Sequence, residues 1–186
     1  MNSNWVYWGN DAKNFVRFWR RMYNIAERVG VTDYNVFVWS SNARSFGSYE
    51  MVEYYPGDIY CDWIGTSCYY TSSVSHGYPS YLMNETESMS EVKPVMITEG
   101  GFGTNQCDNS LWVQEWFGLK STHPRVKGVI WENHHSGTQE RRIYTDEAAL
   151  GVYRNLVQDD YWLDYIPSEV LDEMAVRKSR QNLNIR

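Results

Sequence analysis

Hydrophobic positions along the chain follow two alternating patterns. From Asp11 to Gly30, apolar residues recur every three or four positions, which is the period of an α-helix with one buried face. Short apolar runs rich in β-branched and aromatic residues are typical of strands buried on both faces, and they occupy residues 35–39, 61–69, 95–98 and 126–131. Further helical patterns occupy residues 81–89, 110–120 and 146–157, and one more short helix is expected after Pro167.

Helices that alternate with buried strands predict an α/β fold with a parallel sheet and right-handed crossovers. No glycine-rich phosphate loop follows a strand, so the sequence does not favour a nucleotide-binding version of this fold. Four strands would leave an open edge on each side, and we expect something to cover these edges. The 186 residues suffice for one domain, whereas a complete eight-stranded β/α barrel typically needs about 250.

A single glutamate stands at the end of the third apolar run. The segment 93–101 reads KPVMITEGG, so Glu99 follows a short strand and precedes two glycines. Barrel enzymes place their catalytic groups at the carboxyl ends of buried strands. A catalytic role for Glu99 is therefore favoured over that of a solvated loop acid.

Composition narrows the range of functions. Aromatic residues make up 16% of the chain, more than an aliphatic core needs, and their flat faces suit sugar rings. The net charge of −6, without any basic stripe, argues against a nucleic-acid partner. Neither a membrane span nor a signal-peptide pattern is visible. The three cysteines lack metal-binding spacing and are interpreted as buried thiols, so neither a metal nor another cofactor is expected.

Five segments together resemble the C-terminal half of glycoside hydrolase family 26, a group of β-mannanases and related endoglucanases among the retaining barrel hydrolases. They are residues 1–9 (MNSNWVYWG), 36–42 (VFVWSSN), 54–65 (YYPGDIYCDWIG), 93–100 (KPVMITEG) and 129–133 (VIWEN). The resemblance implies a (β/α) barrel of TIM type, with its strands five to eight in residues 1–165. Residues 166–186 would then form a helical tail.

The resemblance also implies roles for individual residues. Glu99 matches the nucleophile at the end of strand seven, and Tyr69 matches the tyrosine that hydrogen-bonds it, with the adjacent Tyr70 as a competitor. Trp131 matches the tryptophan beneath the sugar at the cleavage point. Further sugar-binding residues are expected at the same face of the barrel: Trp5, Trp8, Trp39 and Asn42.

The family's general acid/base is a glutamate in a His-Glu-Met-Asn sequence at the end of strand four, and the match to this chain begins just after that glutamate. The resemblance thus places the acid/base outside the chain. Glu50, Glu53 and Glu132 match no family acid, and strand alternation is expected to turn Glu132 away from the pocket. Because a missing proton donor typically costs about 100-fold to 10,000-fold in rate, the isolated chain should be inactive or nearly so.

Three hypotheses follow. The first is a retaining endo-acting hydrolase of β-mannan or β-glucan type polysaccharide, which is an incomplete catalytic pair unless an N-terminal half-barrel is supplied. The second is a non-catalytic carbohydrate-binding or scaffold protein derived from such a barrel. The third is a half-barrel that self-associates through its strand edges. The sequence does not choose among mannan, mixed-linkage glucan and xylan, and a longer precursor would point to secretion.

Overall fold

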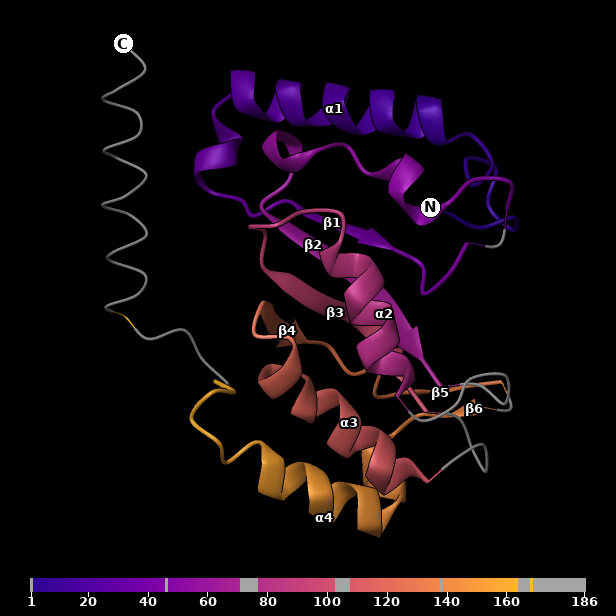
Figure 1. Ribbon diagram of the computed structural model, residues 1–186, viewed down its shortest axis with the longest axis vertical. Coiled ribbons are helices and arrows are strands. Elements are labelled where there is room, and N and C mark those ends of the chain that lie inside the picture. The colour runs from indigo at the N-terminus through magenta and orange to yellow at the C-terminus, as the bar shows by residue number, and fades with distance from the viewer. Residues whose placement is uncertain are drawn as a thin grey trace. The chain divides into compact units, whose positions relative to one another are not determined.

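The computed structural model describes residues 2–45, 47–70, 77–102, 108–137, 139–163 and 168. The chain divides into two units, Met1–Leu156 and Val157–Arg186. The expected division into residues 1–165 and 166–186 stays a prediction. The first unit contains every helix and strand labelled in Figure 1. The short helix expected after Pro167 lies outside the described residues.

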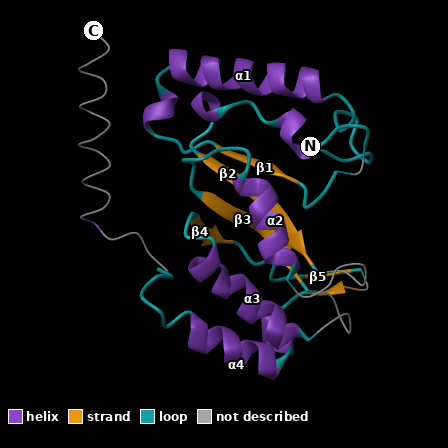
Figure 2. Cartoon of the chain, in the orientation of Figure 1, coloured by secondary structure: helices purple, strands orange, loops and turns teal. Residues whose placement is uncertain are grey.

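A parallel sheet of four strands lies at the centre of the first unit. Its strands are β1 (Val38–Ser41), β2 (Trp63–Tyr69), β3 (Val95–Gly101) and β4 (Val126–Val129), and each pairs with the next one in the chain. Figure 2 shows the strands side by side in this order, with helices around them. The parallel α/β fold predicted from the alternating pattern is therefore confirmed.

Four α-helices accompany the sheet. They are α1 (Ala12–Arg28), α2 (Tyr78–Glu87), α3 (Asn109–Thr122) and α4 (Glu147–Leu156). The helix α1 begins after Asp11, whose carboxylate accepts the Asn14 N–H at 3.1 Å, and it ends before Gly30, where a φ of 77° suits a residue without a Cβ. No helix within the described ranges combines the length and the apolar character needed to cross a bilayer.

Several element boundaries differ from the sequence-based prediction. The strand β1 starts three residues later than expected. The helix α2 starts three residues earlier than expected and has Pro79 in its first turn, where a backbone N–H would have no partner within the helix. The segment expected to be a polar loop after β1 contains a short 3-10 helix, Met51–Tyr54, because Met51 and Tyr54 are buried in the core. A small hairpin of β5 (His135–Ser136) and β6 (Gln139–Glu140) was not predicted.

The strands present alternate residues to α3 and to the opposite side of the sheet. Trp112 and Trp116 of α3 are fully buried, and their rings lie 5.0 Å from those of Tyr70 and Trp131, respectively. On the same side, a Cβ at Gly100 would approach Trp116 Cη2 to 2.7 Å. The aromatic core therefore fills the space between the sheet and α3. The strand side chains on the opposite face of the sheet are then available to form a site.

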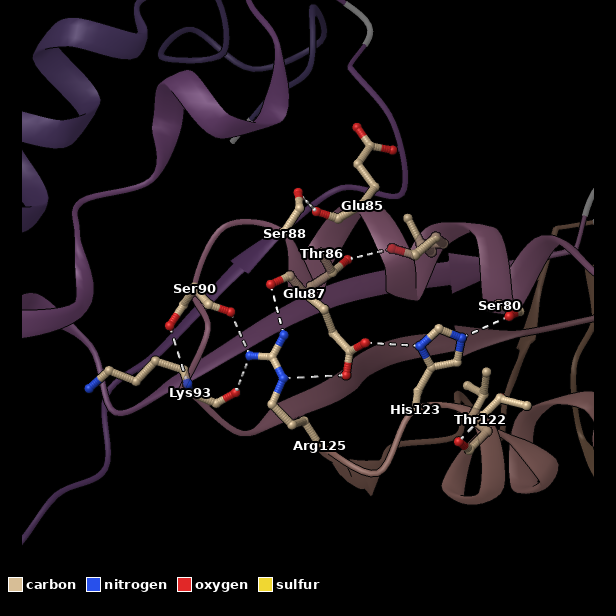
Figure 3. A network of polar contacts seen from close by, with 12 residues as sticks. Ser80, Glu85, Thr86, Glu87, Ser88, Ser90, Lys93, Thr122, His123 and Arg125 are labelled. Atoms are coloured by element: carbon tan, nitrogen blue, oxygen red, sulfur yellow. Dashed lines mark hydrogen bonds and ion pairs between the residues drawn. The ribbon is translucent and has the colours of Figure 1, made fainter.

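A buried polar cluster ties α2 to the end of α3 (Figure 3). The ring of His123 is held between Glu87, at 2.9 Å from Nδ1, and the Ser80 hydroxyl, at 2.7 Å from Nε2. The Arg125 guanidinium donates hydrogen bonds to three backbone carbonyl oxygens, those of Glu87, Ser90 and Lys93. Because these groups are largely removed from water, the cluster fixes the strand ends opposite to those that carry Glu99.

Candidate active site

A shift in strand register positions Glu99. Thr66 of β2 pairs with Ile97 of β3. The next residue of β2, Ser67, pairs with Glu99, which leaves Thr98 as an extra residue on β3. Strict alternation would put Thr98 and Glu99 on opposite faces of the sheet, but an inserted residue resets the alternation.

The contacts of Thr98 show which face the two residues share. Its hydroxyl lies 2.5 Å from that of Ser40 on β1, on the far side of β2. The side chain crosses β2 at Gly65, where an added Cβ would come within 2.4 Å of Thr98 Cγ2. Ser40 and Glu99 both line the same cavity, so the bulge brings Glu99 to the face of the sheet that Thr98 already occupies.

This cavity has a volume of about 590 Å³ and lies at the carboxyl ends of β1, β2 and β3. Five of the seven predicted site residues line it: Glu99, Tyr69, Trp5, Trp8 and Asn42. The residues Trp5 and Trp8 are 63% and 57% exposed, so a ligand in the cavity could reach them. The cavity thus combines one carboxylate with exposed indoles and hydroxyl groups.

The segment that carries the two indoles is anchored to the end of β1 by Asn2. The Asn2 side chain is buried, accepts the N–H of Asn42 at 2.7 Å and donates to its carbonyl oxygen at 3.3 Å. A Cβ at Gly9 would lie 1.6 Å from the carbonyl oxygen of Ser3, so the segment folds back on itself only with glycine there. These contacts fix one wall of the cavity.

Tyr69 and Glu99 are in direct contact. The Tyr69 hydroxyl donates a hydrogen bond to Glu99 Oε1. Burial raises the pKa of Tyr69 well above its ordinary value, and the hydrogen bond to Glu99 and the nearby carboxylate of Glu132 raise it further. The phenol therefore stays protonated at neutral pH and can serve as a donor. The competing Tyr70 instead packs its ring against Trp112 at 5.0 Å.

Two further residues, at or beside the site, were given no role there by the sequence analysis. Glu132 was expected to turn away from the pocket, and it is not among the residues that line the cavity. Strand-like hydrogen bonds continue beyond β4, from the Ile130 N–H to Ile97 O and from the Glu132 N–H to Gly100 O, both 2.8 Å, and hold this segment against β3. Glu132 Oε2 lies 3.2 Å from the Nε of Arg141. Arg141, which lines the cavity, places its guanidinium carbon 4.9 Å from the centre of the Tyr69 ring.

The structure corrects the expectation for Trp39. Its neighbour Ser40 lines the cavity, so strand alternation sends the indole to the other face, where it is fully buried. The indole N–H donates to the carbonyl oxygen of Tyr54 at 3.1 Å, and its ring lies 5.2 Å from that of Tyr55. Trp39 is a core residue without a surface on which a sugar could stack.

Trp131 lies beside the cavity and is not among the residues that line it. Its half-buried ring packs against Trp116 and Phe102 at 5.0 and 4.9 Å, and its N–H donates to Arg141 O at 2.8 Å. A place for Trp131 beneath a sugar stays a prediction.

Metal ligation finds no support in the part of the chain that the structure describes, where no three His, Cys, Asp or Glu side chains gather as metal ligands would. Cys61 and Cys68 are buried free thiols, whereas Cys107 lies outside the described residues. His134 and His135 each contact a separate carboxylate, Glu132 at 3.3 Å and Glu140 at 3.4 Å.

Comparison with known proteins identifies the family. The model of glycosyl hydrolase family 26 matches residues 1–124. The fold is similar to the family 26 domain of an endo-β-mannanase/endo-β-glucanase from Prevotella bryantii, with 16% identity, a TM-score of 0.56, and coverage of 84% of this chain and 42% of that one. It is also similar to the catalytic domain of an endo-β-1,4-mannanase from Bacillus sp. JAMB-750, with 17% identity, a TM-score of 0.59, and coverage of 86% and 48%.

No curated protein sequence matches the chain significantly. The chain spans less than half the length of the two solved structures, so it corresponds to part of a family 26 barrel. The family model extends over more than half of the chain, including all of β1, β2 and β3 and the residues Tyr69 and Glu99. The chain therefore belongs to glycosyl hydrolase family 26.

Proposed function

We propose that Glu99 is the nucleophile of a retaining, endo-acting glycoside hydrolase that cleaves β-mannan or β-glucan type polysaccharide. The observation that carries this proposal is the hydrogen bond from Tyr69 to Glu99 Oε1 inside a cavity lined by exposed indoles. Family membership supports the class of reaction, and the two solved neighbours act on mannan or glucan by their descriptions.

The proposed reaction proceeds by two displacements. Glu99 attacks the anomeric carbon and forms a covalent glycosyl-enzyme, which water then hydrolyses with net retention of configuration. Tyr69 supports the first step because its hydroxyl holds Oε1, so that Oε2 is presented to the sugar in one orientation. Trp5 and Trp8 would hold the polymer by stacking on sugar rings at the cavity wall.

The second carboxylic acid of the pair is proposed to come from a segment outside this chain, either in a longer polypeptide or in a companion half-barrel. This part of the proposal is supported by coverage of only 42% and 48% of the neighbouring barrels and by the family motif expected upstream. The acid protonates the leaving oxygen, a contribution of about 100-fold to 10,000-fold. Polysaccharide cleavage is therefore proposed for the completed barrel only.

An activated substrate tests the nucleophile in the chain as it is. The 2,4-dinitrophenolate of a 2,4-dinitrophenyl β-mannoside or β-cellobioside leaves without protonation. The first displacement, in which Glu99 takes the glycosyl group, therefore does not need the acid. Azide can then replace water in the second displacement. We expect dinitrophenolate release that azide accelerates, a β-glycosyl azide as product, and loss of both in Glu99→Ala. Glu91→Ala, which removes an exposed carboxylate outside the cavity, serves as the control. Equal release by Glu99→Ala and the unaltered chain would refute the assignment.

A carbohydrate-binding role without cleavage is the second candidate, favoured by the 57% exposure of Trp8 at the cavity wall. It predicts that manno- or cello-oligosaccharides bind in isothermal titration calorimetry and that no glycosidic bond breaks in any pairing of half-barrels. Trp8→Ala should weaken this binding several-fold or more, since an aromatic contact contributes about 0.5–1.5 kcal/mol. Tyr34→Ala, at an exposed ring outside the cavity, should not.

A further inference from the structure

Arg141 covers one face of the Tyr69 ring and is held from several sides. Its guanidinium carbon lies 4.9 Å from the ring centre, within the range of a cation–π contact. Its Nε lies 3.2 Å from Glu132 Oε2. The Arg141 backbone accepts the indole N–H of Trp131 at 2.8 Å and donates to the carbonyl oxygen of His134 at 3.2 Å. The guanidinium therefore has a fixed place beside the proposed nucleophile.

The Tyr69 hydroxyl has one proton, so it can donate to only one acceptor at a time. Glu99 accepts the hydrogen bond. Glu132 is the second carboxylate beside the phenol, because its Oε2 lies 3.2 Å from the Arg141 guanidinium that covers the Tyr69 ring. Without the guanidinium of Arg141, Glu132 would compete with Glu99 for this proton. Such competition would let the phenol swing between two acceptors and would release Glu99 from its fixed orientation.

The ion pair between Arg141 and Glu132 Oε2 weakens this competitor, while His134 Nδ1 lies 3.3 Å from the other oxygen, Oε1. The side chains of Arg141 and Glu132 are only 20% and 19% exposed, so water screens their attraction less than at an open surface. The Arg141 guanidinium contacts both the competing carboxylate and the ring that carries the proton. One side chain thus acts on both groups that decide where the proton goes.

We propose that Arg141 is a positioning residue that directs the single Tyr69 proton to Glu99 by engaging Glu132, an inference that rests on the proposed role of Glu99 as the nucleophile. Arg141 itself takes part in no bond making or breaking. Its effect on the reaction passes through the orientation of Tyr69 and therefore of Glu99.

The neighbouring Arg142 provides a matched control. Its guanidinium carbon lies 5.6 Å from the centre of the Tyr144 ring, and its Nη2 pairs with Glu140 at 2.5 Å. Arg142 thus repeats the two contacts of Arg141, a ring face and a carboxylate, one position along the chain, but it does not line the cavity. Loss of a generic cation or of local packing should affect both positions alike.

The test measures covalent trapping of Glu99 by a 2,4-dinitrophenyl 2-deoxy-2-fluoroglycoside, which forms the glycosyl-enzyme but hydrolyses slowly. Arg141→Met should slow trapping about tenfold or more, because Tyr69 would share its proton between two carboxylates and weaken the hydrogen bond that it donates to Glu99. Arg142→Met should not. Arg141→Lys, which keeps the charge, should retain most of the rate. The double variant Glu132→Gln/Arg141→Met should recover most of it, because the competing carboxylate is gone.

A normal rate in Arg141→Met, or no recovery in the double variant, would overturn the inference. The ¹³Cζ NMR signal of Tyr69, assigned with Tyr69→Phe, gives a second readout without any reaction. It should move in Arg141→Met and return in the double variant. If the unaltered chain is not trapped, the nucleophile proposal fails, but the NMR signal still tests the role of Arg141. A signal that moves in Arg141→Met and returns in the double variant supports this role, and a signal that does not move rejects it.

Discussion

The side chains of Tyr69 and Glu99 meet although their backbones are not paired with each other. Tyr69 pairs with Gly101 across the β2–β3 boundary, and Glu99 pairs with Ser67. The phenol therefore reaches back along β3 to the carboxylate and donates to Oε1. This diagonal contact depends on the extra residue Thr98, without which Glu99 would face the aromatic core.

The Tyr69 hydroxyl should govern the reactivity of Glu99. Tyr69→Phe removes the only proton that the ring donates, and we expect trapping by an activated fluoroglycoside to slow about tenfold to 100-fold, since hydrogen bonds to charged groups contribute about 1.5–3 kcal/mol. Tyr70→Phe is the matched control because that ring packs against Trp112 on the other side of the sheet. Equal rates for the two variants would contradict the assignment.

Gly100 should tolerate no side chain. An added Cβ would lie 2.0 Å from Cys68 O and 2.7 Å from Trp116 Cη2, so Gly100→Ala must push β3 away from β2 or from α3. We expect a loss of about 1–3 kcal/mol in the free energy of unfolding, measured by urea denaturation. Gly118→Ala, on the exposed side of α3 with no atom within 4 Å, should instead stabilise by about 0.5–1 kcal/mol. The same sign for both would contradict this packing.

The polar cluster around His123 should stabilise the sheet. Glu87→Gln leaves the shape of the side chain but removes the charge that faces His123 Nδ1 and Arg125 Nε. Because these groups are largely buried, we expect a loss of about 2 kcal/mol or more in unfolding free energy. Glu91→Gln removes the same charge from an exposed neighbouring position and should have little effect. A larger effect at Glu91 would argue against the cluster.

Stability should decline in alkaline solution because of tyrosines whose protonated form is favoured in the folded state. Burial raises the pKa of Tyr78 to about 12 and the pKa of Tyr69 well above its ordinary value. Unfolded tyrosines titrate near pH 10, so above about pH 10 the unfolded chain releases protons that the folded chain retains, and stability falls.

This loss should be absent below about pH 10 and should grow up to about pH 12 for Tyr78. Urea denaturation at several pH values between 8 and 12 measures it. Tyr78→Phe should flatten the decline, whereas Tyr34→Phe, at an 86% exposed ring, should leave it unchanged. A decline of the same slope in Tyr78→Phe would show that Tyr78 does not contribute.

Much of the fold could be predicted from local pattern. The apolar runs before Tyr69 and Glu99 are strands because β-branched and aromatic residues fill both faces of a buried sheet, and the polar residue that ends each run falls at the cavity edge. Ends of parallel strands meet at one side of the sheet, so strand order places Glu99 and Tyr69 at the same edge, and the bulge at Thr98 decides which face Glu99 takes. Glu99 was therefore predicted from its place at a strand end, whereas Tyr69 was predicted from the family resemblance, with Tyr70 as an open alternative.

The remaining features depend on register and on contacts between distant residues. The bulge at Thr98 has no local signal, since it reflects the fit of three strands around Gly65. Trp39 was misplaced because an apolar run does not reveal which of its alternate residues faces the core. Arg141 follows an unpredicted hairpin, and its contacts with Tyr69 and Glu132 exist only in the folded chain.

The most direct test of the central claim is the site of covalent attachment. The chain would be treated with a 2,4-dinitrophenyl 2-deoxy-2-fluoroglycoside of mannose or cellobiose, digested with a protease and mapped by tandem mass spectrometry. The account predicts one added glycosyl group on the peptide that contains Glu99, absent from Glu99→Gln. Attachment at another carboxylate, or no attachment with either sugar, would contradict it.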